Sequence, residues 1–195
     1  MQLIFATHNK NKVHEAQIAA PPGIKIISLH DIGYLHNIPE PHDTLEANAL
    51  EKLNTIWQQY GLPCFAEDAG LEVEALNNQP GVFTARYAAL HGSSLANPLF
   101  LLEKMQGITN RKARFRAVVA LVLNNNNPPV LFQGQVQGQI THQPIGNGGF
   151  AYDPVFIPDG HTRTFAQLTD SEKHAISHRG LAMRQLWSFL GKQPL

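Results

Sequence analysis

The amino-acid sequence predicts an α/β protein built on a mixed β-sheet that helices flank. Three observations lead to this fold class. An apolar, strand-like run opens the chain, and a helix-like segment follows it directly. Strand-like segments with turn residues between them fill the middle of the chain. An amphipathic helix ends it. Helices that alternate with strands at both ends, with hairpins between, are typical of a mixed sheet.

The first elements are a strand over residues 3–6 and a helix from residue 9 to about 20. The helix must stop there because two prolines follow, and proline disfavours the helical conformation in the residue before it. A second helix is expected after Asp43, because Glu46 stands three residues later, at the spacing of a capping box. Its apolar residues fall on one helical face, namely Leu45, Ala49, Leu53 and Ile56.

The middle of the chain is interpreted as two hairpins. A strand end at 63–66 and an alternating run at 71–75 predict a hairpin that turns at Glu67-Asp68-Ala69-Gly70. Segments 115–123 and 130–140 predict a second, antiparallel pair of strands across a loop rich in Asn and Pro. The later strand alternates glutamines with glycines and apolar residues, which is typical of a strand with one face in water.

Two further helices are expected. One begins near Asn97, because Pro98 suits a first helical position and Gly107 suits the end. The other covers residues 181–190 and places its apolar side chains on one face, before a terminating glycine.

Composition limits the classes of function. The chain has 195 residues, with 15 Lys+Arg against 15 Asp+Glu and a hydrophobic share of 43%. These values predict a single folded domain over residues 1–195 and argue against a protein that holds nucleic acid by bulk charge. The longest apolar run is too short to cross a bilayer, and the N-terminus lacks the pattern of a secretory signal. We therefore expect a cytoplasmic protein with no nucleic-acid or membrane partner.

Thiol and zinc chemistry are poorly supported. Cys64 is the single cysteine and has apolar neighbours, which favours a buried, inert thiol over a nucleophile. His174 and His178 lie four residues apart, but no third zinc ligand accompanies them.

The turn between the first strand and the first helix is a candidate phosphate site. Helix N-termini offer unpaired N–H groups and partial positive charge, both suited to anions. An ordinary polar turn with solvated lysines is the alternative interpretation. The segment contains neutral donors and two lysines but no glycine, in the order Thr7, His8, Asn9, Lys10, Asn11 and Lys12.

Acidic residues of the first half form a second candidate group, namely Glu40, Asp43, Glu46, Glu67 and Asp68. Asp43 and Glu46 fit helix capping. Glu67 and Asp68 are neighbours near a strand end, so their side chains should point to opposite faces, and at most one should enter a given cleft. Carboxylates that converge there could hold Mg²⁺. Simple solvent exposure is the alternative for Glu40 and Asp68.

Two segments of the second half complete the candidates. Glycines at 146–149 precede Phe150 and Tyr152, so an aromatic ring could stack on a base, which is worth about 1–3 kcal/mol. The alternative is a loop with both rings turned into the core. Arg179 stands in the segment Ser177-His178-Arg179-Gly180 at the start of the last helix, and it carries a fork of donors suited to a carbonyl oxygen or a phosphate. Its alternative interpretation is a surface helix start.

Six motifs, in this order, resemble those of the RdgB / inosine triphosphate pyrophosphatase family. They occupy residues 5–12, 43–49, 66–73, 80–87, 148–156 and 172–180. The resemblance implies hydrolysis of non-standard purine nucleoside triphosphates (ITP, dITP, XTP) to the monophosphate and pyrophosphate, with Mg²⁺. It also implies an elongated mixed sheet flanked by helices, two lobes around a central nucleotide cleft, and a homodimer.

The resemblance also implies roles for single residues. It places the proton acceptor on Asp68 and the metal ligands on Glu40 and Asp68. It places substrate contacts on Thr7, His8, Asn9, Lys10, Asn11, Lys12, Lys52, Ala69, Phe150, Ala151, Tyr152, Asp153, Lys173, His178 and Arg179. The sequence departs from the common pattern at four places, with Ala69 for Ser, Ala151 for Gly, Ala47 for Glu and His174 for Asn.

The implied reaction agrees with simple electrostatics. Attack on the α-phosphorus requires that the triphosphate charge be neutralised, which the N-terminal lysines, Lys52 and Mg²⁺ can do. An ionised Asp68 can activate the water. Donors on Arg179 or His178 would favour a 6-oxo purine over adenine. Two alternatives stay open at this point: a Maf-type pyrophosphatase of modified pyrimidine nucleotides, and a non-catalytic nucleotide-binding module.

Overall fold

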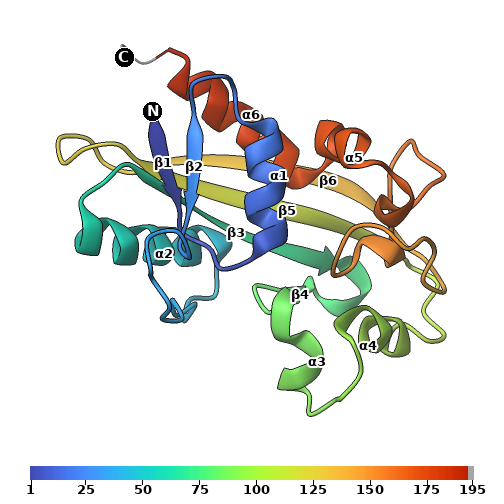
Figure 1. Ribbon diagram of the computed structural model, residues 1–195. Helices are drawn as coiled ribbons and strands as arrows, with labels where there is room; N and C mark the ends of the chain where they lie inside the picture. The colour runs from blue at the N-terminus through green and yellow to red at the C-terminus, as the bar shows by residue number, and fades with distance from the viewer. Residues whose placement is uncertain (193–195) are drawn as a thin grey trace. The chain divides into compact units, whose positions relative to one another are not determined.

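The computed structural model describes residues 1–192 and confirms the mixed α/β fold (Figure 1). Seven strands of the described chain form one sheet in the order β2-β1-β3-β5-β6-β7, with β4 beside β3. β1 runs parallel to β2 and β3, whereas the β3–β4 and β6–β7 pairs are antiparallel. The strands are β1 (Gln2–Phe5), β2 (Lys25–Ser28), β3 (Cys64–Val73), β4 (Gln79–Gly81), β5 (Lys112–Val122), β6 (Val130–Ile140) and β7 (Phe156–Pro158).

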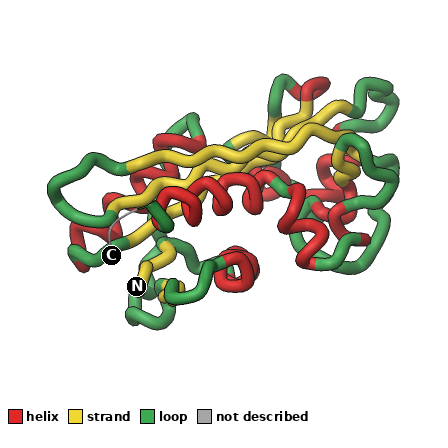
Figure 2. The backbone as a smooth tube through the Cα atoms, turned by 90° about the horizontal axis from the view of Figure 1, so that it is seen from above, coloured by secondary structure: helices red, strands yellow, loops and turns green. Residues whose placement is uncertain are grey.

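Six α-helices accompany these strands within residues 1–192 (Figure 2). They are α1 (Lys10–Ala19), α2 (Leu45–Tyr60), α3 (Tyr87–Leu90), α4 (Asn97–Lys104), α5 (Asp170–Ile176) and α6 (His178–Leu190). Each of these helices is too short or too polar to span a membrane.

The chain divides into two compact units by its internal contacts. The first unit comprises Met1–Asp68, Ala117–Gly134 and the chain from Arg179 onward. The second comprises Ala69–Arg116 and Gln135–His178. The nucleotide cleft implied by the family resemblance stays a prediction.

Aromatic side chains from three elements form the centre of the first unit. The rings of Phe5 and Phe65 stack with centroids 4.2 Å apart, and Trp187 of α6 meets Phe65 edge-on at 6.1 Å. The expected apolar face of α2 is buried as well, which confirms its helical periodicity. Burying each such side chain stabilises the fold by about 1.5–3 kcal/mol. This packing fixes β3 and α6, two of the elements that carry the site described below.

The second unit has its own aromatic core. Phe115 of β5 contacts Phe156 and Phe165, with ring centroids 4.8 Å and 6.1 Å away. Leu71 and Val73 of β3 belong to the same cluster. The two long strands β5 and β6 are neighbours in the sheet, as expected for the pair across the Asn-Pro loop (Figure 2).

The predicted hairpin at residues 67–70 is wrong, because β3 runs through these residues without a turn. The strand lies between β1 and β5 and is buried almost throughout, so it shows no alternation of polar and apolar residues. Gly70 makes no turn, and its missing side chain lets the backbones of β3 and β4 approach closely. A Cβ atom placed on it would lie 2.5 Å from the carbonyl oxygen of Gly81 in β4.

Two helix starts differ from expectation. Thr44, and not Asp43, is the N-cap of α2, where its hydroxyl accepts a hydrogen bond from the Ala47 N–H at 3.2 Å. The last helix begins at His178, three residues earlier than its apolar pattern indicated. The early start brings Arg179 into the first turn of α6.

Cys64 is fully buried, and burial raises the pKa of its thiol to about 12. We therefore expect no reaction of the native protein with a thiol reagent such as Ellman's reagent near pH 8, since the thiolate is the reactive form. The absorbance of the released nitrothiobenzoate measures the reaction. The guanidinium-unfolded chain is the control and should react with one equivalent. Rapid labelling of the folded protein would contradict the inert role of this cysteine.

Candidate active site

The side chain of Asn9 caps the N-terminus of helix α1 and accepts hydrogen bonds from backbone N–H groups of the first helical turn. Its Oδ1 accepts hydrogen bonds from the backbone N–H of Asn11 at 3.0 Å and of Lys12 at 3.3 Å. The hydroxyl of Thr7 accepts one from the Asn9 N–H at 3.2 Å. The expected unpaired N–H groups are therefore already bonded at these positions. An anion at this helix end would bind the lysine side chains or displace Asn9.

Three residues of the predicted phosphate segment line one pocket of the first unit. The pocket has a volume of about 260 Å³. It is lined by Thr7, His8, Lys10, Val13, Ser28 and His30. The Nε2 atom of His8 lies 2.8 Å from the carbonyl oxygen of His36, which holds the imidazole ring at the pocket.

Lys12 projects from α1 towards the neighbouring acids of β3. Its Nζ lies 3.4 Å from Oε1 of Glu67, and 17% of the side chain is exposed. Burial lowers the pKa of Lys12, and the negative charge of Glu67 opposes that shift. The Lys12 side chain is thus partly exposed while its ammonium keeps a buried counter-charge.

Glu67 is itself held by Arg179. The Arg179 guanidinium donates from Nε to Oε2 of Glu67 at 2.7 Å and from Nη2 to Oε1 at 2.8 Å. Its Nη1 donates to Oε2 of Glu15 at 2.5 Å. Burial works against the charge of Arg179, but the two glutamates outweigh it and raise its pKa. This bidentate geometry is the strong form of an ion pair.

Lys52 contacts both predicted metal ligands, Glu40 and Asp68. Its Nζ donates to Oδ1 of Asp68 at 2.6 Å and to Oε1 of Glu40 at 2.8 Å. Burial opposes the charge of Lys52, yet Asp68 and Glu40 together raise its pKa. Burial also raises the pKa of Asp68, although Lys52 and Lys12 partly offset the effect. A carboxylate with a raised pKa is a better general base than an exposed one.

Glu40 and Asp68 fit a hard cation such as Mg²⁺. Both present an oxygen to the same ammonium, so their oxygens converge on one point. Within residues 1–192, no three His, Cys, Asp or Glu side chains are grouped to hold a metal. A cation here would therefore take two carboxylates and complete its shell with water and substrate oxygens, which is the usual Mg²⁺ arrangement.

Three predicted residues of the second unit form a separate cluster. Oδ2 of Asp153 accepts hydrogen bonds from the Phe150 backbone N–H at 2.7 Å and from Lys173 Nζ at 2.8 Å. The Lys173 ammonium lies 4.5 Å from the centroid of the Phe150 ring, within cation–π distance. Gly149 permits this arrangement, because a Cβ atom there would collide with the Asp153 carboxylate. The cluster fixes the orientation of the Phe150 ring.

Two other predicted rings lie in the core of the second unit. Tyr152 is fully buried, and its hydroxyl donates to the carbonyl oxygen of Thr84 at 3.1 Å. The imidazole of His178 stacks on Phe115, with centroids 4.6 Å apart and planes inclined by 9°. For Tyr152, this is the core position that the sequence left open as the alternative.

Ala151 adopts a left-handed backbone conformation, with φ of 51°. For a residue with a Cβ this conformation costs about 1–2 kcal/mol, whereas glycine adopts it readily. We expect Ala151→Gly to raise the free energy of unfolding by about 0.5–1 kcal/mol, after the entropic cost of glycine is subtracted. Urea denaturation measures the change. Ala47→Gly, in the regular helix α2, is the control and should destabilise. A loss of stability in Ala151→Gly would contradict the strain argument.

The structure thus brings eight of the predicted residues together in two clusters, one in each unit, whereas Thr7, His8 and Lys10 line a separate pocket. The first-unit cluster, which we call the lysine–carboxylate centre, consists of Lys12, Glu15, Glu40, Lys52, Glu67, Asp68 and Arg179. The sequence motifs did not indicate that Glu67 and Glu15 are the ion-pair partners of Arg179. Glu15 stands three residues after Lys12, so the two share one helix face, and this spacing could have indicated it.

The fold and this centre define an α/β protein that gathers cations and carboxylates at the end of a parallel strand pair, an arrangement suited to phosphate chemistry. The Ham1 family model matches residues 3–189, and the chain belongs to this family.

Relatives match over nearly the whole chain. The dITP/XTP pyrophosphatase of Flavobacterium psychrophilum is 51% identical over 97% of this chain and 98% of its own. That of Porphyromonas gingivalis is 46% identical, with 97% of each chain covered. Among solved structures, the Staphylococcus aureus Ham1 protein has a TM-score of 0.87 at 32% identity and covers 99% of this chain and 100% of its own.

Proposed function

We propose that the protein hydrolyses non-standard purine nucleoside triphosphates, with dITP, ITP and XTP as substrates, to the monophosphate and pyrophosphate. The observation that carries the proposal is the Glu40–Lys52–Asp68 arrangement, in which a buried carboxylate with a raised pKa touches a lysine. The names of the relatives, dITP/XTP pyrophosphatases of similar length, support the substrate class. Residues 1–195 form one functional domain in this proposal.

Asp68 is the proposed proton acceptor. Its carboxylate orients a water molecule towards the α-phosphorus and takes its proton as the oxygen–phosphorus bond forms. Pyrophosphate is the leaving group, so the bond between the α-phosphorus and the bridging oxygen breaks. Lys12 and Lys52 stabilise the negative charge on the phosphate oxygens, and Lys10 adds a further cation at the helix start.

Mg²⁺ is the proposed cofactor, held by Glu40 and Asp68. When bound, it supplies charge neutralisation for the triphosphate and orients it. The same two carboxylates contact Lys52, so the lysine balances their charges when the cation is absent. Homodimer formation and a cytoplasmic location stay predictions.

Phe150 is the proposed platform for the purine base. Asp153 accepts a hydrogen bond from the Phe150 backbone N–H, and Lys173 lies over one face of the ring, so the other face is the one on which a base would stack. Stacking of this kind is worth about 1–3 kcal/mol and does not depend on the identity of the base. Discrimination between 6-oxo and 6-amino purines is assigned in this proposal to His178 and Arg179, as the family resemblance implies.

A substrate panel with product analysis tests the proposed function. The protein is incubated with Mg²⁺ and ITP, dITP, XTP, ATP, GTP or UTP, and anion chromatography identifies the products. We expect pyrophosphate and the monophosphate from the first three substrates at much higher rates than from the others. Release of orthophosphate alone, or preferred turnover of UTP, would contradict the proposal. Tight ITP binding without any turnover would point to a binding module.

A further inference from the structure

Glu67 is a buried acid that the proposed chemistry does not use. Its side chain is fully buried and lies between two cations, Lys12 and Arg179. An unpaired carboxylate at such a site would be very costly, so both partners matter to its charge. The four groups Lys12, Glu67, Arg179 and Glu15 form a continuous chain of alternating charge, which joins α1, β3 and α6.

We propose that Glu67 is a positioning residue, which Arg179 locks in place and which in turn holds the Lys12 ammonium where it meets the substrate phosphates. This inference rests on the proposed function. It extends that function by giving a role to an acid that neither the sequence motifs nor the reaction required.

The distances support these two roles, in which Arg179 fixes Glu67 and Glu67 positions Lys12. Arg179 donates two short hydrogen bonds of 2.7 and 2.8 Å to Glu67, and this bidentate pair fixes the orientation of the Glu67 carboxylate. Lys12 lies at the longer distance of 3.4 Å. The negative charge of Glu67 keeps the Lys12 ammonium nearby, and the ammonium can still donate a hydrogen bond to a phosphate oxygen. By contrast, Lys52 contacts Asp68 at 2.6 Å, a distance typical of a full ion pair.

The charges around Lys12 explain why a carboxylate is needed at position 67. Lys52 and Arg179 both repel the Lys12 ammonium, whereas Glu67 and Asp68 attract it. Asp68 is already engaged by Lys52. Without the charge of Glu67, Lys12 would be driven from two neighbouring cations towards solvent. The substrate phosphates would then lose the contact that the Lys12 ammonium provides.

This role predicts a specific kinetic pattern for Glu67→Gln. We expect KM for ITP to rise about 10-fold with a smaller change in kcat, because a binding contact is misplaced while the base Asp68 stays. Glu15 still holds the Arg179 guanidinium in this variant. The ratio of kcat/KM values for ITP and ATP should therefore change much less than KM, since the two substrates share their phosphates. A residue that acted on base recognition would change that ratio.

A double-mutant cycle tests whether Glu67 acts through Lys12. Steady-state constants for ITP are measured for the wild type, Glu67→Gln, Lys12→Gln and the double variant. We expect Glu67→Gln to have almost no further effect once Lys12 is gone, because the group that it positions is absent. Equal effects of Glu67→Gln in both backgrounds would overturn the proposal.

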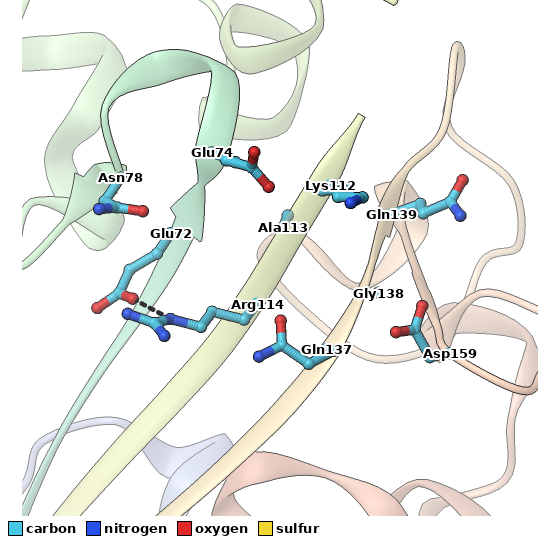
Figure 3. A pocket seen from close by; sticks show the side chains of 10 residues that line it. All are labelled: Glu72, Glu74, Asn78, Lys112, Ala113, Arg114, Gln137, Gly138, Gln139 and Asp159. Atoms are coloured by element: carbon cyan, nitrogen blue, oxygen red, sulfur yellow. Dashed lines mark hydrogen bonds and ion pairs between the residues drawn. The ribbon is translucent and has the colours of Figure 1, made fainter. Parts of the chain in front are cut away.

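Glu72→Gln is the matched control. Glu72 lies on the same strand and is 9% exposed, and it accepts a hydrogen bond from Arg114 Nε at 2.5 Å (Figure 3). It also accepts one from Arg116 Nη1 at 3.2 Å. It lines a pocket of the second unit that contains none of the predicted site residues. Both variants lose a glutamate–arginine pair, but 38% of the Arg114 side chain is exposed against 4% of the Arg179 side chain. Glu72→Gln should therefore lose less stability than Glu67→Gln, and it should leave KM unchanged. A similar rise in KM in both would show that lost stability alone explains the effect.

Binding of inorganic tripolyphosphate, measured by calorimetry, separates this inference from the proposed function. Tripolyphosphate has no base, so its affinity should fall about 10-fold in Glu67→Gln even if the protein does not hydrolyse ITP. If Glu67→Gln does not fold, Glu67→Asp retains the charge at a shorter reach and should show a smaller loss. Unchanged tripolyphosphate affinity in a folded variant would refute the positioning role.

Discussion

Asp68→Asn should reduce kcat for ITP by about 1,000-fold, since a general base typically contributes 10²–10⁴-fold. Asparagine has nearly the same shape as aspartate and still offers an oxygen to Lys52, which contacts Oδ1 in the native protein at 2.6 Å. The fold should therefore persist while the proton acceptor is lost. Steady-state kinetics by pyrophosphate release measures the change, and circular dichroism verifies the fold.

Asp31→Asn is the control for this substitution. Asp31 is an exposed acid of the first unit, and its Oδ2 accepts hydrogen bonds from the backbone and hydroxyl of Ser28. The Asp31→Asn substitution should leave kcat for ITP unchanged. An Asp68→Asn protein with near-native turnover would place the proton acceptor on another residue.

Lys52→Gln should have the largest effect on stability. Lys52 is buried with Asp68, and its removal leaves two converging carboxylates without their shared cation. Breaking a buried ion pair by removing one partner costs about 3–5 kcal/mol. We expect a loss of this order in the free energy of unfolding, together with a fall in kcat/KM of about 100-fold. Urea denaturation and steady-state kinetics measure the two effects.

Magnesium should restore part of this stability. A cation held by Glu40 and Asp68 replaces the missing positive charge, and a ligand that binds only the folded state stabilises it by mass action. Millimolar Mg²⁺ should therefore raise the melting temperature of Lys52→Gln more than that of the wild type. Lys25→Gln, which removes an exposed lysine of β2, should respond as the wild type does. An identical Mg²⁺ response in all three proteins would exclude Glu40 and Asp68 as the cation site.

The sequence predicted most elements correctly where apolar periodicity was strong. The helix α2 and the strand β6 appear as expected, because each has one buried and one solvated face. The failure at β3 has a clear physical reason. A central strand is buried on both faces, and its acids Glu67 and Asp68 are compensated by lysines and an arginine from other elements. Sequence alone shows two adjacent acids and a glycine, which is the composition of a turn.

The candidate site was predictable in its parts but not in its pairings. The family resemblance implied Lys12, Lys52 and Asp68, yet nothing in the spacing shows that Lys52 contacts both Glu40 and Asp68. Arg179 was interpreted as a base-reading donor, and the structure reveals its bonds to Glu67 and Glu15. These contacts join residues more than 100 positions apart in sequence. Only the folded chain determines which charges are neighbours.

Hydrolysis of ITP in ¹⁸O-labelled water is the most direct test of the chemistry assigned to the lysine–carboxylate centre. Mass spectrometry of the products locates the oxygen that the attacking water contributes. Attack on the α-phosphorus places one ¹⁸O atom in IMP and leaves pyrophosphate unlabelled. Label in pyrophosphate or in orthophosphate, with unlabelled nucleotide, would show attack at another phosphorus and contradict the mechanism.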